Sequence, residues 1–121
     1  MATISRVTLS ESTDGRGVAV AATSSAGTTI HTGPSDAGIR DEIWLWASNF
    51  NTSAETLVLQ WGGVTAIGDH FITVIQPNET VLVAPGWQIK GNAGTALIVK
   101  AYSTTTNKVN IAGYVNRIDA T

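Results

Sequence analysis

The chain has 121 residues, of which 43% are hydrophobic and 13% charged, with no cysteine and a formal net charge of −2. Its length suits one domain with a real core, and its hydrophobic content excludes a disordered chain. The lack of cysteine excludes disulfides, thiolate metal sites and thiol catalysis. The Lys and Arg residues are scattered along the sequence. This argues against nucleic acid as the main partner, because phosphate binding needs clustered cations.

The sequence carries no signal for export or for membrane insertion. Its start, MATISRVTLS, lacks the apolar segment of a signal peptide. No apolar run approaches the roughly 18 residues that a membrane-spanning helix needs. We therefore expect a soluble protein made in a cytoplasm. A surface with so few charges is unusual for a free cytosolic protein, and it fits one whose surface is largely covered by neighbouring chains.

The first third of the chain predicts only weak strands, at 4–10, 18–23 and 28–32. They are short runs of Val, Ile and Thr separated by the turns DGRG and SSAG. Because this third is poor in large apolar residues, we expect residues 1–30 to form an N-terminal arm or peripheral strands. Residues 31–121 would then form the core of a single domain.

The rest of the chain opens with a long strand at 40–50, RDEIWLWASNF, followed by the turn NTSA and a half-buried strand at 55–61, ETLVLQW. Helical periodicity is nearly absent throughout. Turns recur every 8–12 residues or so, which is typical of sandwiches and barrels. We predict an all-β fold, an antiparallel β-sandwich (jelly-roll-like) or a compact β-barrel, with about eight or nine strands. The remaining strands are expected at 70–76, at 80–84, between PGW and KGNAG, at 95–103 and at 108–118.

The strand at 40–50 is apolar on both of its faces. Ile43, Leu45 and Ala47 point one way, and Trp44 and Trp46 point the other. An antiparallel sheet in a small domain usually packs one face on the core and leaves the other in water. Burying one Trp removes about 150–250 Å² of surface, worth about 4–6 kcal/mol at 25 cal/mol per Å². Something therefore has to cover the two tryptophans.

The strands at 70–76 and 95–103 are apolar on both faces as well, so we expect part of the second face to be an interface between copies of the chain. The residues predicted for this interface are Trp44, Trp46, Ile98 and Tyr102. Three alternatives stay open. The second face could lie under another layer of the same domain, serve as a platform for a ligand, or belong to a compact barrel with a few exposed apolar residues.

Residue types that carry catalysis are sparse, and His31 and His70 are the only histidines. Asp69 and His70 are adjacent, as are Asp41 and Glu42. Adjacent strand residues point to opposite faces, so neither pair can share a ligand, and we interpret Asp41 and Glu42 as a charged strand entrance. No nucleophile elbow and no phosphate-binding glycine loop is present. We predict no catalytic, cofactor or metal residues and a protein that is not an enzyme.

The four tryptophans Trp44, Trp46, Trp61 and Trp87 raise a ligand hypothesis. With Asn and Asp in neighbouring loops, they could form a sugar-stacking face on a carbohydrate-binding β-sandwich. In the alternative interpretation, Trp61 and Trp87 fill the core or anchor the ends of strands.

The segments DEIWLWASNFNTSAETLVLQWGG and NIAGYVNRI resemble small all-β virion proteins of tailed bacteriophages, of the type that decorate or cement the capsid. The similar features are an EIWLW…N strand, a short turn, an LVLQWGG strand, a P-x-x-T-V-L-V-x-P-G hairpin and a final strand ending GYVNRI. The resemblance covers residues 28–118.

The resemblance implies a non-enzymatic structural subunit on the capsid surface of a virion, made in the host cytoplasm. Proteins of this type are often homotrimers that bind the major capsid protein and stabilise the shell against internal DNA pressure. An arm often reaches to a neighbouring subunit, and here that arm would be residues 1–30. A role in head–tail joining or in a tail fibre fits the same features.

Overall fold

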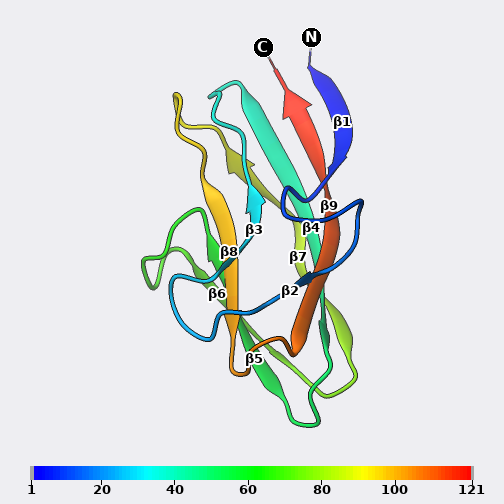
Figure 1. The fold of residues 1–121 in the computed structure, drawn as a ribbon. Coiled ribbons are helices and arrows are strands. Elements are labelled where there is room, and N and C mark those ends of the chain that lie inside the picture. The colour runs from blue at the N-terminus through cyan, green and yellow to red at the C-terminus, as the bar shows by residue number, and fades with distance from the viewer. Residues whose placement is uncertain (1, 121) are drawn as a thin grey trace.

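The computed structural model describes residues 2–120, which form nine β-strands and no helix (Figure 1). The all-β prediction is therefore confirmed, and none of the described residues belongs to an apolar helix that could span a membrane. The strands are β1 (Thr3–Thr8), β2 (Val18–Ala19), β3 (Thr28–Thr32), β4 (Ile39–Asn49), β5 (Glu55–Trp61), β6 (His70–Ile75), β7 (Thr80–Lys90), β8 (Ile98–Ser103) and β9 (Val109–Asp119).

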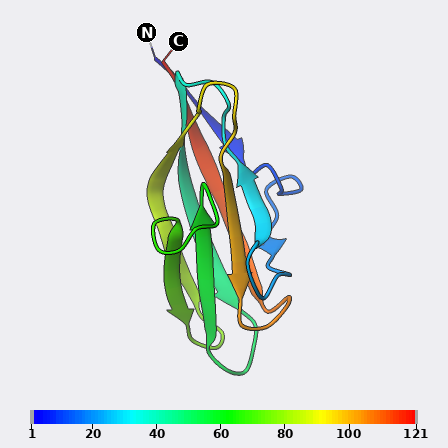
Figure 2. The same ribbon diagram turned by 90° about the vertical axis from the view of Figure 1, so that its left-hand side faces the viewer.

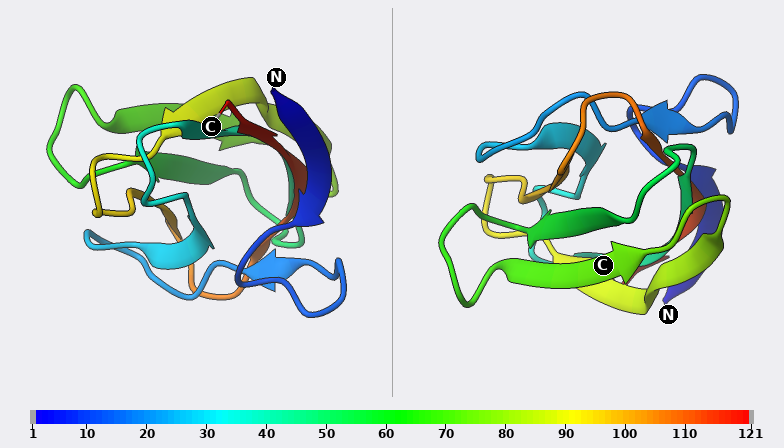
Figure 3. Two further views of the ribbon diagram at one scale, coloured as in Figure 1. Left: turned by 90° about the horizontal axis from the view of Figure 1, so that it is seen from above. Right: turned by 90° about the horizontal axis from the view of Figure 1, so that it is seen from below.

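The strands form two antiparallel sheets that face each other (Figure 2). Sheet A has the order β1-β9-β4-β7, with β2 also paired to β9, and sheet B has the order β3-β8-β5-β6. The end-on views of Figure 3 show the strands arranged around a common interior. The two sheets do not join into a closed barrel, so the fold is a sandwich.

The pairing of the strands is nested: β2 pairs β9, β3 pairs β8, β4 pairs β7 and β5 pairs β6. This is the pattern of one long antiparallel hairpin whose tip is β5–β6. Two further pairings, β4 with β9 and β5 with β8, roll the hairpin into two sheets. Eight strands in two such sheets make a jelly roll, with β1 as an additional edge strand on β9.

Two predicted connections differ from the structure. We expect NTSA, and likewise TTTN (104–107) between the last two predicted strands, to join neighbouring strands of one sheet. In the structure each of them carries the chain from one sheet to the other. The strand predicted at 80–84 and the short strand after PGW are a single strand, β7. Pro85 lies inside it, next to a register shift, and β7 is at the edge of sheet A, where proline is tolerated. The pairing of β7 with β4 shifts register on either side of Trp44 and Leu45.

The core lies between the two sheets. The inward residues Ile43 and Leu45 of β4 are fully buried, as are Leu57 of β5 and Val99 of β8. Residues of the first third also belong to this core: Leu9, Val20 and Ile30 are each at most 1% exposed. The two strands at the start of the chain, β1 and β2, lie at the edge of sheet A on β9.

A buried carboxylate joins both sheets. Asp41 of β4 is fully buried, so the prediction that it forms a charged strand entrance is wrong. Arg117, its neighbour across the ladder on β9, donates Nε to Asp41 Oδ1 at 2.8 Å and Nη2 to Oδ2 at 2.9 Å. His31 of β3, in sheet B, lies with Nε2 at 2.7 Å from Oδ2. The backbone N–H of Ser10 donates to His31 Nδ1, so the imidazole proton lies on Nε2 and points at Asp41.

Replacing Asp41 tests this network. Burial by itself raises the pKa of Asp41, but the hydrogen bonds from Arg117 and His31 outweigh burial and hold its pKa below the ordinary value. The ionised carboxylate therefore stabilises the fold above the unfolded-state pKa of about 3.9, and this contribution disappears as the pH falls through the lower folded value. We expect Asp41→Asn to lower the free energy of unfolding by about 2–4 kcal/mol at pH 7.

The measurement is urea unfolding of the wild type and of Asp41→Asn between pH 7 and pH 2.5 or so, with the exposed Glu11 replaced by Gln as the control. The difference between the wild type and Asp41→Asn should shrink below about pH 3.9. A difference that is the same at both ends of the pH range would contradict the assigned charge of Asp41.

Candidate functional site

An aromatic face lies on the outside of sheet A. We give this name to Trp44 and Trp46 of β4 together with Tyr114 of β9, the cross-strand partner of Trp44. The inward positions of β4 fill the core, so the two tryptophans point away from it, as the sequence predicts. All three side chains are half-buried. They occupy the two central strands of the sheet.

The three rings lie next to one another. The Trp44 ring is nearly parallel to the other two, whereas the planes of Trp46 and Tyr114 are tilted by 33°. The ring centroids of Trp44 and Trp46 are 6.3 Å apart with planes at 22°, and those of Trp44 and Tyr114 are 6.3 Å apart at 17°. Trp46 and Tyr114 complete the triangle at 6.1 Å. The guanidinium of Arg6 lies over the Tyr114 ring, 4.6 Å from its centroid. On the other side, Leu82 of β7 pairs with Trp46 and is 44% exposed. The apolar surface thus extends over β9, β4 and β7.

The polar groups that border the rings are paired with one another. Glu42 Oε1 accepts hydrogen bonds from Trp44 Nε1 at 2.8 Å and from Asn116 Nδ2 at 3.1 Å. Arg6 Nε donates to Asn116 Oδ1 at 3.1 Å. The bond from Trp44, followed by that from Asn116, holds the pKa of Glu42 below its ordinary value. These bonds fix the Trp44 indole, and they reduce the number of polar atoms left without a partner if another molecule covers the face.

Two glycines leave room for Trp44. A Cβ on Gly86 of β7 would lie 2.9 Å from the Trp44 ring, so the indole lies directly against the Gly86 backbone. A Cβ on Gly113 of β9 would overlap the carbonyl oxygen of Trp44. The aromatic face therefore depends on small residues in both strands that flank β4.

The other two residues predicted for the interface lie elsewhere. Ile98 and Tyr102 alternate with the buried Val99 and Ala101 of β8, so they point out of sheet B, on the opposite side of the sandwich. The rings of Tyr102 and His70 lie at 76° to each other, with their centroids 6.3 Å apart. The predicted set is thus divided into two pairs on two outer faces, and one flat contact cannot include all four residues.

Trp61 and Trp87 do not join the aromatic face. Their rings meet edge to face at 5.4 Å, and Phe71 lies 4.7 Å from Trp87. With Gln88, these residues line an apolar pocket of about 340 Å³. Both tryptophans pack against the core cluster, and Trp61 Nε1 donates to the carbonyl of Gln88. They connect β5 of sheet B with β7 of sheet A, so the four tryptophans do not form one sugar-stacking surface.

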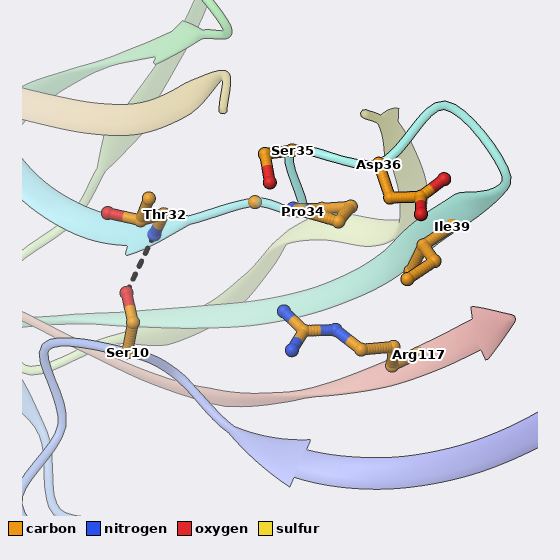
Figure 4. A pocket seen from close by; sticks show the side chains of 8 residues that line it. Ser10, Thr32, Pro34, Ser35, Asp36, Ile39 and Arg117 are labelled. Carbon is orange, nitrogen blue, oxygen red and sulfur yellow. Dashed lines mark hydrogen bonds between the residues drawn. The ribbon is translucent and has the colours of Figure 1, made fainter. Parts of the chain in front are cut away.

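A polar pocket of about 420 Å³ is lined by Arg117, the side chain that binds the buried Asp41. Figure 4 shows Arg117 with Ser10, Thr32 and the other lining residues. Arg117 points into the pocket, but Nε and Nη2 of this side chain are already bonded to Asp41. Ser10, His31 and Asp41 are the residue types of a catalytic triad, and their geometry differs from one. The Ser10 hydroxyl accepts from the Thr32 N–H at 2.6 Å, while His31 Nδ1 accepts from the Ser10 backbone. No hydrogen bond links the hydroxyl to the imidazole, as nucleophile activation requires.

The described residues contain no candidate metal site. Within residues 2–120, no group of three or more His, Cys, Asp or Glu side chains could hold a metal ion. His70 lies with Nε2 3.2 Å from Gln60 Nε2, and Asp69 accepts from the Thr65 N–H, so these sequence neighbours make separate contacts.

Substituting Gly86 tests whether the Trp44 indole needs the space over β7. Gly86→Ala forces the indole to move and strains a backbone with φ of 75°. Gly94→Ala is the matched control, because Gly94 has φ of 97° but open space around its Cβ position. We expect Gly86→Ala to lower the free energy of unfolding by about 1–2 kcal/mol more than Gly94→Ala, measured by urea unfolding. Equal losses would show that the contact with Trp44 contributes nothing.

Comparisons with known proteins do not assign the chain to a family. No family model, no curated protein and no solved structure matches the chain. The jelly roll is a fold that serves many functions. The function therefore has to be argued from the aromatic face.

Proposed function

We propose that the chain is a non-enzymatic virion structural subunit of the capsid-decoration type, and that its aromatic face is covered by another copy in a homo-oligomer. A trimer is the favoured form, with the major capsid protein as the further partner. The observation that carries the proposal is the aromatic face itself: Trp44, Trp46 and Tyr114 form one apolar surface on the outer side of a sheet.

The composition of this face supports a protein partner. Trp, Tyr and Arg are the residues that most often dominate the binding energy of protein interfaces, and Arg6 lies directly on Tyr114. The exposed Leu82 extends the apolar area beyond the rings. Because Glu42, Asn116 and Arg6 already bond to one another, a partner could cover them at little cost in lost hydrogen bonds.

The capsid part of the proposal rests on the resemblance of the sequence to decoration proteins, together with the fold. Jelly rolls are common in viral capsid proteins and also in lectins. The fold is therefore compatible with a decoration subunit but does not distinguish it from a sugar-binding protein. A decoration subunit should co-sediment with empty heads of the phage that encodes it.

A carbohydrate-binding module is the second candidate, and the nearly parallel rings of Trp44 and Tyr114 favour it. A sugar ring stacks on flat aromatic side chains, and Trp44 and Tyr114 deviate from parallel by only 17°. The polar border argues against it, because specific sugar binding needs well-placed polar groups to fix the ligand. Here Glu42 Oε1 already takes two donors from the chain itself.

Trp46→Ser tests the proposal. Trp46 is the better choice because Trp44 also holds the Glu42 hydrogen bond. If copies associate through the aromatic face, the variant should fold, but the dissociation constant of its oligomer should be about tenfold or more higher than that of the wild type. This is a typical effect of losing an interface tryptophan. Light scattering after size exclusion gives the mass, and circular dichroism reports the fold. Ile67→Ser is the control, since Ile67 is 88% exposed in the loop before β6.

The same pair of variants separates the two candidates. A sugar-binding platform would lose its response in a glycan screen on Trp46→Ser while its solution mass stayed unchanged. An unchanged mass together with unchanged glycan binding would contradict both candidates for this face.

A further inference from the structure

We infer that β6 pairs with β6 of a second copy, antiparallel and centred on Thr73, so that sheet B continues from one sandwich into the next. This contact is separate from the aromatic face, which belongs to sheet A. It does not depend on the proposed virion role.

One edge of β6 is open. The strand is the last in sheet B and pairs only with β5. The backbone N–H of Trp61 donates to Asp69 O at 2.7 Å. Since hydrogen-bonded and non-hydrogen-bonded pairs alternate along an antiparallel ladder, Phe71, Thr73 and Ile75 bond to β5. The N–H and C=O groups of Ile72 and Val74 then point away from β5, and none of them bonds to another element within residues 2–120.

The other edges of the sandwich carry features that hinder pairing. The edge strand β7 contains Pro85 and register shifts, β3 has a register shift of its own, and β1 contains Arg6. The residues of β6 from Phe71 to Ile75 include no charge, proline or glycine, and their pairing with β5 has no register shift. Natural proteins rarely leave such an edge free.

Exposed apolar side chains follow this edge. Ile72 is 68% exposed and Val74 is 56% exposed, both on the outer face of sheet B. Phe71, on the other face, is 41% exposed. The cross-strand partner of Ile72 is Val58, which is itself paired with Tyr102, so the apolar surface continues inward from the edge. A partner strand would thus gain apolar contacts as well as main-chain hydrogen bonds.

A second copy of β6 is the occupant that this strand fits best. Centred on Thr73, the pairing places Ile72 opposite Val74 of the copy, twice, about a two-fold axis. These are the residues whose main-chain groups point outward, so each such pair exchanges two hydrogen bonds. Centring the pairing on Ile72 would instead place Val74 opposite His70. The pairing about Thr73 keeps apolar residues together and brings the two Thr73 side chains face to face.

Cross-linking tests this register, because the chain has no cysteine of its own. In a non-hydrogen-bonded antiparallel pair the Cα atoms lie about 4.5 Å apart, within the range that a disulfide spans. We expect Thr73→Cys to form a disulfide dimer under mild oxidation at least about tenfold faster than Val74→Cys, whose two copies are offset along the strands. Equal rates for the two variants would overturn the register.

A charge placed on the edge tests the contact without a cross-link. Val74→Lys puts a charge opposite Ile72 of the copy, whereas Thr56→Lys puts it on the same face one strand inward, since Thr56 is the cross-strand partner of Val74. We expect Val74→Lys to raise the dimer dissociation constant about tenfold or more and Thr56→Lys to change it less than about threefold, by analytical ultracentrifugation.

Both variants are measured in the wild-type chain and in Trp46→Ser, so that loss of the aromatic-face contact cannot be mistaken for loss of the edge contact. Equal dissociation constants for Val74→Lys and Thr56→Lys in both backgrounds, or a monomeric Trp46→Ser chain at millimolar concentration, would overturn the inference.

Discussion

Each sheet of a two-layer sandwich can bury only one face against the other sheet, and this constraint shapes the whole molecule. The inward residues of β4 and β5 fill the space between the sheets and are buried in the single chain. The outward residues of β4, Trp44 and Trp46, can be covered only by their neighbours on the same face or by another molecule. Their mutual packing with Tyr114 covers them in part, and the proposed subunit contact would complete it.

The buried ion pair holds the framework on which this face is built. Asp41 lies two residues before Ile43 on the inner side of β4 and is bonded to Arg117 of β9. Glu42, between Asp41 and Ile43, points outward and bonds to Trp44. The pairing of β4 with β9 thus fixes a charged contact inside the sheet and an aromatic contact outside it. The same strands therefore carry both stability and the candidate site. The edge of β6 lies in the other sheet, so one chain can make both proposed contacts at the same time.

The sequence predicts where the strands lie along the chain better than it predicts which strands lie side by side. The strands at 28–32 and 55–61 have their predicted bounds, and the alternation along 40–50 correctly divides Ile43 and Leu45 from Trp44 and Trp46. Alternation shows which residues share a face but not which strand lies beside it, so the contribution of Tyr114 to the aromatic face was missed. The sequence indicates only that Tyr114 points to the opposite face from its neighbour Val115, which is buried in the structure. The interpretation of Asp41 as a strand entrance is wrong for the same reason, since a carboxylate appears exposed in a sequence until its partner Arg117, far along the chain, is known.

The most direct test of the central claim is the solution mass of the wild-type protein, measured by light scattering behind size exclusion over a dilution series. If the outer aromatic face is covered by another copy, the protein should be a compact oligomer at high concentration and lose mass only on dilution. A monomer at every concentration would contradict the account. The aromatic face would then have to be explained by a ligand or by a different protein.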